Sequence, residues 1–346
     1  MREATRTDLF DEARRSFEGA AQAEGVHERT ASIAGGRVAM RFAGEAIERI
    51  FFRAFAHLES AGDGVPGMTI HVWDPSASGG SAPPPLPEPT DGLRLRYLLR
   101  TADRAAFAQP GEGFVSLLDR PRREAFHWLI DRDRVPSYER GTPFRSLLNW
   151  WLAGRGGGFV HAGAVGDERG GVLLGGRGGS GKTTAALVCL RAGMRYVSDD
   201  YVAAAAGQDP VAWGLFGSAK LEPEHSHRFP ELAATALPPA DWEVGAKVIV
   251  FPNEAFPEQV VDSLPVRAVV LPRVVGESAT TVRPVSRAAA LAALAPSTVL
   301  QLPGAGDTEL QAIGRLIREV PSFVMEIGED MDAIPAVVST VLEEAS

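Results

Sequence analysis

One segment constrains this chain more than any other. Residues 176–183 read GRGGSGKT, which fits the pattern G-x-x-x-x-G-K-[ST] of a phosphate-binding loop, the Walker A motif of a P-loop. The apolar run Val172–Leu174 before it predicts a buried strand, and the residues from Lys182 onward predict a helix that ends at Gly193. A strand, a phosphate loop and a helix in this order indicate an α/β fold.

The residue types of the loop explain the chemistry that it predicts. Glycines let the backbone turn and present N–H groups to phosphate oxygens, and the positive end of the following helix adds to that attraction. The lysine can reach the β- and γ-phosphates, and the threonine hydroxyl can coordinate magnesium. We therefore expect ATP-binding with Mg²⁺. The residues expected to hold this nucleotide are Gly176, Gly178, Gly179, Ser180, Gly181, Lys182, Thr183 and Thr184.

The same glycines also satisfy a second pattern. Residues 176–181 fit G-x-G-x-x-G, the dinucleotide-binding fingerprint, and Asp199 follows Gly181 by 18 residues, near the place of a ribose-binding acid. That fold packs the first helical turn closely against its sheet, where Lys182 and Thr183 have no role. The lysine favours the phosphate loop. The dinucleotide site and a glycine-rich turn without a ligand are the alternatives.

Two adjacent carboxylates follow the loop helix. Asp199 and Asp200 end an expected strand, and ligands of parallel α/β sheets bind at the carboxyl ends of the strands. Because side chains alternate across a strand, the two carboxylates should have different roles. We expect Asp199 to accept the proton of an attacking hydroxyl and Asp200 to lie on the metal side, with the reverse order left open. An ordinary acidic strand end is the alternative.

One histidine and the rare lysines are further candidates. His161 ends the expected strand FVH, where it either holds Asp199 in position or is an ordinary buried hydrogen-bonding residue. Only three of the 35 basic residues are lysine, which suggests positions that need a compact point charge. Besides Lys182, we expect Lys220 or Lys247 to supply a second cation to the reacting group. The alternative is that Lys220 and Lys247 are ordinary surface lysines that have been kept by chance.

Composition limits the class of protein. The chain has 346 residues, of which 45% are hydrophobic and 23% charged, as in globular proteins, and the formal net charge is −9. The acidic balance argues against a general nucleic-acid-binding protein. A single cysteine, Cys189, excludes an intrachain disulfide, and no run approaches the roughly 18 apolar residues that span a bilayer. We expect a cytoplasmic protein with no nucleic-acid or membrane partner.

The pattern of elements changes near residue 145, where we place a boundary between domains at 1–145 and 146–346. Before it, the expected elements are helices at 5–24 and 44–58, strands at 30–33, 38–42, 68–73, 93–99, 113–118 and 124–130, and a Pro-rich loop at 75–89. After it, they are strands at 159–166, 170–176, 195–204, 247–251, 268–271 and 322–327, with helices at 144–153, 183–193, 286–295, 308–318 and 334–344. The first domain is therefore expected to be α+β and the second α/β.

Three segments in the second domain resemble one known family. VHAGAV, GVLLGGRGGSGKTTAALVCLRAG and RYVSDDYV are similar, in this order, to the kinase domain of HPr kinase/phosphorylase. The loop also resembles that of ATP-dependent phosphoenolpyruvate carboxykinase, which shares this fold. The likeness is greatest to the HPr-kinase-like proteins of bacterial peptide-maturation clusters, including lasso-peptide kinases. It covers roughly residues 145–346.

The resemblance implies a function for each motif. It implies transfer of the γ-phosphoryl group of ATP to a serine of a protein or precursor peptide, with Asp199 as base, Lys182 on phosphate, Thr183 on magnesium, and His161 nearby. The arginine-glycine segment of the bifunctional enzymes is not found here, which argues against phosphorylase activity and against HPr as substrate. Residues 1–145 do not match the family's N-terminal domain, so we expect them to recognise a different partner. The rings that relatives form are compatible with a homo-oligomer.

Two other functions suit the same residues. A nucleotide-gated binding module, or ATPase, would use the bound ATP to position a peptide for other maturation enzymes. A carboxykinase-like enzyme would phosphorylate a small molecule instead of a protein.

Overall fold

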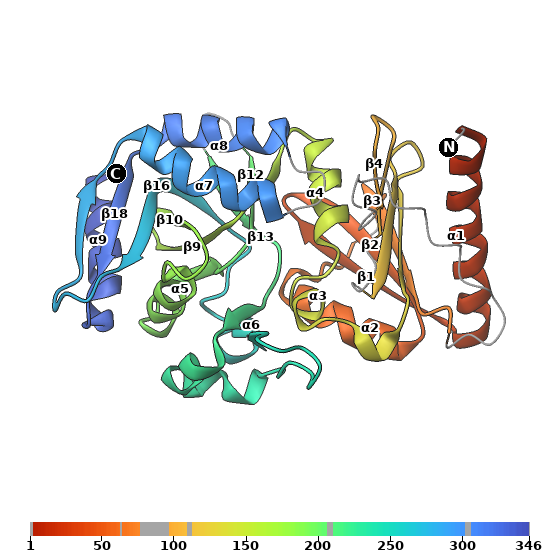
Figure 1. The fold of residues 1–346 in the computed structure, drawn as a ribbon, viewed down its shortest axis with the longest axis horizontal. Helices are drawn as coiled ribbons and strands as arrows, with labels where there is room; N and C mark the ends of the chain where they lie inside the picture. Colours follow the sequence, from red (N-terminus) through yellow and green to blue (C-terminus); the bar gives the residue numbers. More distant parts are fainter. Residues whose placement is uncertain are drawn as a thin grey trace. The chain divides into compact units, whose positions relative to one another are not determined.

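The computed structural model describes residues 3–62, 64–76, 97–108, 113–205, 210–301 and 306–345. The chain forms two compact units, Met1–Trp151 with Ala240–Glu243 and Leu152–Pro239 with Val244–Ser346, here called the N-terminal and C-terminal units. Both combine helices and strands (Figure 1). The assignment of residues 240–243 to the N-terminal unit was not expected from the sequence. None of the helices in the described part of the chain combines the length and apolar character needed to cross a bilayer.

A seven-stranded sheet forms the centre of the N-terminal unit. Its order is β1-β2-β3-β7-β6-β5-β4, with β3 parallel to both of its neighbours and the other pairs antiparallel. The strands are β1 (Val26–Ile33), β2 (Gly36–Ala43), β3 (Met68–Trp73), β4 (Tyr97–Arg100), β5 (Arg104–Ala108), β6 (Phe114–Asp119) and β7 (Glu124–Leu129). The helices are α1 (Glu3–Glu24), α2 (Glu45–Phe51), η1 (Phe52–Leu58), η2 (Arg132–Arg134), α3 (Ser137–Gly141) and α4 (Arg145–Ala153), of which the last two residues of α4 are assigned to the C-terminal unit.

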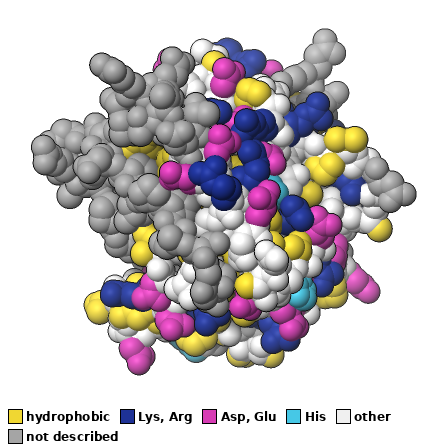
Figure 2. All heavy atoms as spheres, turned by 90° about the vertical axis from the view of Figure 1, so that its right-hand side faces the viewer, with side chains coloured by type: hydrophobic (Ala, Val, Ile, Leu, Met, Phe, Trp, Pro, Cys, Tyr) yellow, Lys and Arg dark blue, Asp and Glu magenta, His cyan; other side chains and the backbone are white. Residues whose placement is uncertain are grey.

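Helix α1 packs on this sheet because its apolar residues recur at helical spacing. Phe10 and Phe17 are buried in one cluster with Trp73 of β3. The indole Nε1 of Trp73 donates a hydrogen bond to Ser16 Oγ at 3.1 Å, which satisfies a buried donor. On the face that Figure 2 displays, the basic (Lys and Arg) and acidic (Asp and Glu) side chains of the described residues are intermingled.

A mixed sheet forms the centre of the C-terminal unit. Its order is β11-β9-β10-β16-β13-β12-β8, and β18 pairs with β16 and β17. β16 is parallel to β10 and β18, whereas β9 is antiparallel to both β10 and β11. The strands are β8 (Gly158–Val160), β9 (Ala162–Asp167), β10 (Gly170–Gly175), β11 (Arg195–Ser198), β12 (Val202–Ala205), β13 (Val211–Gly214), β16 (Ser263–Val274), β17 (Thr281–Pro284) and β18 (Ser322–Ile327). A separate pair is β14 (Ala219–Leu221) with β15 (Val248–Val250).

Helices cover both faces of the mixed sheet. α5 (Lys182–Arg191) and α9 (Ile334–Glu344) share one buried cluster with the sheet. α7 (Arg287–Gln301) and α8 (Asp307–Glu319) share another, on the opposite side of the sheet from α5 (Figure 1). The shorter helices are η3 (Pro223–Arg228), η4 (Pro230–Thr235), α6 (Pro252–Ala255) and η5 (Met331–Ala333).

Most expected elements are confirmed, and two expected strands are each divided. The strands at 68–73 and 322–327 and the helix at 334–344 have the expected bounds. The segment 159–166 is not one strand, because β8 ends before His161 and β9 begins after it. The Pro-rich loop expected at 75–89 lies almost wholly outside the described residues.

The segment 195–204 is the second divided strand. It forms β11 and β12, with a break at residues 199–201. The two breaks lie next to each other, because Val202 pairs with Val160 while Ser198 pairs with Ala164. The strands here are antiparallel, whereas the placement of the acid pair was argued from the carboxyl end of a strand in a parallel sheet.

Candidate active site

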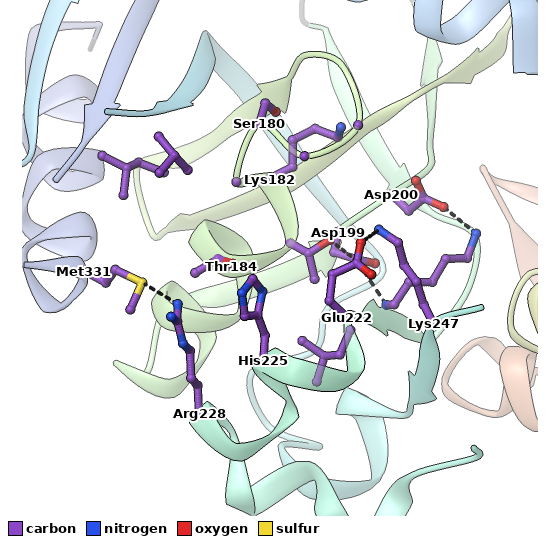
Figure 3. Close-up of a pocket in the computed structure, with 18 of the residues that line it drawn as sticks. Ser180, Lys182, Thr184, Asp199, Asp200, Glu222, His225, Arg228, Lys247 and Met331 are labelled. Atoms are coloured by element: carbon purple, nitrogen blue, oxygen red, sulfur yellow. Dashed lines mark hydrogen bonds and ion pairs between the residues drawn. The ribbon is translucent and has the colours of Figure 1, made fainter. Parts of the chain in front are cut away.

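A cavity of about 560 Å³ opens where β10 ends and α5 begins (Figure 3). Its volume is in the range of small-molecule sites, which is roughly 300–1,000 Å³. Residues of the phosphate loop, the acid pair, η3 and the ends of β16 and β18 line it. Of the residues expected in the site, all but Gly176 are part of this lining.

The loop has a conformation that depends on glycine. Gly176, Gly179 and Gly181 have positive φ angles of 144°, 75° and 99°. Residues other than glycine rarely adopt such backbone angles. A Cβ atom at Gly178 or Gly179 would meet nothing within 4 Å, so this side of the loop is open. Ser180 Oγ is buried and has no hydrogen-bond partner among the described residues. An open glycine loop at the start of a helix suits an anion.

Lys182 is folded back onto the loop. Its Nζ donates hydrogen bonds to the carbonyl oxygens of Gly176 at 2.8 Å and Arg177 at 3.1 Å. Burial lowers the pKa of Lys182, and the charges of Asp200 and Asp199 oppose that effect. A largely desolvated ammonium group therefore lies inside the loop, where its field is weakly screened.

Asp199 contacts the beginning of the loop helix. Its Oδ2 accepts hydrogen bonds from Thr183 Oγ1 at 2.8 Å and from the Lys220 backbone N–H at 3.2 Å, and the Tyr196 hydroxyl lies 3.5 Å from Oδ1. Burial and the charge of Asp200 raise the pKa of Asp199 to about 6. Asp200 was expected on the metal side, but the Thr183 hydroxyl contacts Asp199.

Asp200 belongs to a different cluster. Its Oδ1 lies 2.8 Å from His161 Nε2, and its Oδ2 accepts a hydrogen bond from Lys220 Nζ at 2.6 Å. Burial disfavours ionisation of this carboxyl, but the Lys220 charge and the His161 hydrogen bond outweigh burial and hold its pKa well below the usual range. His161 therefore contacts Asp200, and not Asp199 as expected. The backbone N–H of His161 donates to Thr298 Oγ1 at 3.0 Å.

Part of the lining was not expected from the sequence. Lys247 was expected, and its Nζ lies 2.9 Å from Glu222 Oε1. His225, Arg228 and Met331 also line the cavity, although no motif marks them. The sequence gives only a weak signal for these residues. Positions 222, 225 and 228 are three residues apart, which suggests a common face.

The donors beside the loop suit magnesium bound together with a nucleotide. Within the described residues, no three His, Cys, Asp or Glu side chains form a group that could hold a metal ion. Mg²⁺ usually binds through one or two carboxylates and substrate phosphates, so it needs no such group. Thr183 Oγ1 and Asp199 Oδ2, 2.8 Å apart, are oxygen donors of the kind that Mg²⁺ prefers.

Comparisons with known proteins give a distant structural likeness. No family model and no curated protein matches the chain. Among solved structures, the chain is similar to the HPr(Ser) kinase/phosphatase from Coxiella burnetii, with 14% identity, 54% of this chain and 94% of that chain covered, and a TM-score of 0.28. A TM-score this low does not establish a shared fold or function.

Proposed function

We propose that the chain is an ATP-dependent, magnesium-requiring kinase that transfers the γ-phosphoryl group to a hydroxyl, as a serine kinase acting on a protein or peptide. The hydrogen bond between Thr183 and Asp199 carries this proposal. In P-loop enzymes that transfer phosphoryl groups, the loop hydroxyl and an acid at a strand end hold the same magnesium ion. The cluster of Asp200, Lys220 and His161 supports catalysis rather than binding alone, because it adds a carboxylate and a cation to the same cavity.

Thr183 and Asp199 are the residues that would hold Mg²⁺. The bound ion would neutralise charge on the phosphoryl group during transfer. Lys182 has the corresponding role from the protein side, since its ammonium group lies within the loop and can exchange its carbonyl partners for phosphate oxygens.

We assign proton acceptance to Asp200, which exchanges the two roles expected from the sequence. Asp199 is engaged by Thr183, whereas Asp200 is held by His161 and Lys220. Lys220 now pairs with Asp200, and a move of its ammonium group to the transferred group would remove a cation from Asp200 and raise the basicity of that carboxylate. The acceptor hydroxyl needs a proton acceptor at that stage, and His161 keeps the carboxylate oriented.

Incubation with ATP labelled at the γ-phosphate tests the proposal. We expect label on a serine-containing protein or peptide, and no label with Lys182→Ala because the phosphates lose their buried cation. Release of free phosphate alone would indicate an ATPase or a nucleotide-gated binding module. Label on a metabolite would indicate a small-molecule kinase, and neither label transfer nor phosphate release in the presence of acceptors would contradict the proposal.

A further inference from the structure

A row of three side chains lies along one side of the cavity. Glu222 precedes η3, and His225 and Arg228 follow at intervals of three residues, all three lining the cavity. In a 3₁₀-helix, side chains at i and i+3 eclipse each other, so this spacing places them on one face. His227, on the same helix, is exposed and is not part of the lining.

The two ends of this row differ in chemistry. Glu222 pairs with Lys247 at 2.9 Å, whereas Arg228 Nη1 lies 3.4 Å from Met331 Sδ at the other end. In Figure 3, Arg228 and Met331 lie on one side of Thr184, and Lys247 lies on the other side with the acid pair. One end of the cavity therefore has a carboxylate paired with an ammonium group, and the other has a guanidinium group beside a thioether.

The phosphate loop determines which end would take the nucleoside. In a P-loop, the lysine reaches the β- and γ-phosphates and backbone N–H groups cradle the α- and β-phosphates. The γ-phosphate belongs beside the acid pair, so the nucleoside extends past Thr184 to the opposite end. Arg228 and Met331 lie at that end.

Apolar side chains next to the loop suit contact with the flat face of an aromatic ring. Val274 lines the cavity with 63% of its surface exposed, and Ile327 lines it as well. A Cβ atom on Gly181 would lie 3.0 Å from Ile327 Cδ1 and 3.3 Å from Val274 Cγ2, so both side chains flank the start of α5. Guanidinium groups stack on aromatic faces, and methionine sulfur makes favourable contacts with aromatic rings.

Arg191, at the end of α5, ties both segments of this end together. Its Nη1 donates to the Arg228 carbonyl oxygen at 3.0 Å, and its Nη2 donates to Asp332 Oδ1 at 2.9 Å. Arg228 and the residue after Met331 are therefore held by the same helix that begins at the phosphate loop. Such support favours a preformed site.

We propose that Arg228 and Met331 form the nucleobase site, with the Arg228 guanidinium stacked on the base and Val274 and Ile327 contributing apolar contacts. This inference rests on the proposed nucleotide-dependent function. Stacking recognises the face of a base rather than the hydrogen-bonding groups at its edge. The site is therefore expected to accept both ATP and GTP.

Calorimetric titration of the full chain with Mg²⁺ and either ATP or tripolyphosphate separates base contacts from phosphate contacts. Arg228→Ala is expected to weaken ATP binding roughly two- to thirtyfold, the range for a cation–π contact, and Met331→Ala roughly two- to tenfold, the range for a sulfur–aromatic contact. Tripolyphosphate, which has no base, is expected to bind all variants equally well. His227→Ala is the matched control on the same helix and should bind both ligands like the unaltered chain.

A conservative variant tests the stacking itself. Arg228→Lys keeps the charge but loses the planar group, so ATP binding should remain weakened while thermal unfolding matches the unaltered chain. Equal weakening of tripolyphosphate binding would place Arg228 on the phosphates and overturn the inference. Unchanged ATP affinity in the alanine variants, or full affinity in Arg228→Lys, would overturn it too. If the unaltered chain binds neither ligand, the proposed function fails as well.

Discussion

At the scale of single residues, two neighbouring carboxylates have different surroundings. Asp199 accepts a hydrogen bond from Thr183 at the start of α5, and Asp200 is held between His161 and Lys220. The separation arises because the pair lies between β11 and β12, where the chain leaves one strand before entering the next. One carboxylate thus faces the loop helix and the other faces the basic side chains.

Asparagine variants of the pair test the assignment of their roles. Asp200→Asn should reduce the rate of phosphoryl transfer by roughly 10²- to 10⁴-fold, the range for losing a general base, and leave ATP binding with Mg²⁺ nearly unchanged. Asp199→Asn should instead weaken the binding of ATP that depends on Mg²⁺, because a neutral amide is a poorer metal ligand. Single-turnover rates and calorimetry measure the two effects. The opposite pattern would restore the order expected from the sequence.

At the scale of elements, broken strands and a 3₁₀-helix build the cavity. β8 and β12 pair with each other, and β9 and β11 pair with each other, so the breaks between these strands are adjacent. His161 lies in one break and Asp200 in the other, which explains their contact at 2.8 Å. The loop lies between β10 and α5, and its glycines allow the chain to turn from the strand into the helix.

Two glycines at the ends of α5 give a matched comparison. Gly181 and Gly193 both have positive φ, of 99° and 87°, so alanine at either position should destabilise the chain by about 1–2 kcal/mol. A Cβ at Gly181 would also lie 3.0 Å from Ile327, whereas a Cβ at Gly193 would meet nothing within 4 Å. We expect Gly181→Ala to lose ATP binding and transfer activity, and Gly193→Ala to lose stability alone. Equal activity in the two variants would contradict a role for the loop conformation.

At the scale of the whole molecule, the chain has two units with separate hydrophobic clusters. The N-terminal unit also holds residues 240–243, where Glu243 accepts a hydrogen bond from the Ser137 backbone N–H at 2.6 Å. In the same unit, His127 is fully buried and its Nδ1 lies 3.0 Å from Ser116 Oγ. The role of residues 1–145 in recognising a partner stays a prediction.

The burial of His127 predicts that acid destabilises the molecule. Burial lowers the pKa of His127 from its ordinary value of 6.5 to about 3, so the folded chain resists a proton that the unfolded chain takes up. This contribution to stability is therefore complete above pH 6.5 and is lost as pH falls towards 3. Between pH 7 and pH 5 the free energy of unfolding should therefore fall by about 2 kcal/mol. Urea unfolding at both pH values measures this change. The free energy of unfolding of His127→Gln should fall by correspondingly less than that of the unaltered chain, and an equal fall would contradict this explanation.

The sequence by itself determined the features that depend on local physical chemistry. The strand Val172–Leu174, the glycine turn and the helix from Lys182 are adjacent in the chain, so residue type and periodicity are enough to predict them. The strands at 68–73 and 322–327 follow for the same reason. The use of the loop to bind a nucleotide stays a prediction.

Only the tertiary structure decided which side chains meet in the cavity. The sequence does not show which partner Asp199 and Asp200 each contact. The pairing of β8 with β12 brings His161 to Asp200, and Thr183 at the start of α5 contacts Asp199. Arg228 and Met331 are about a hundred residues apart and carry no motif. Contacts of this kind depend on long-range strand pairing and helix packing, which local residue patterns do not encode.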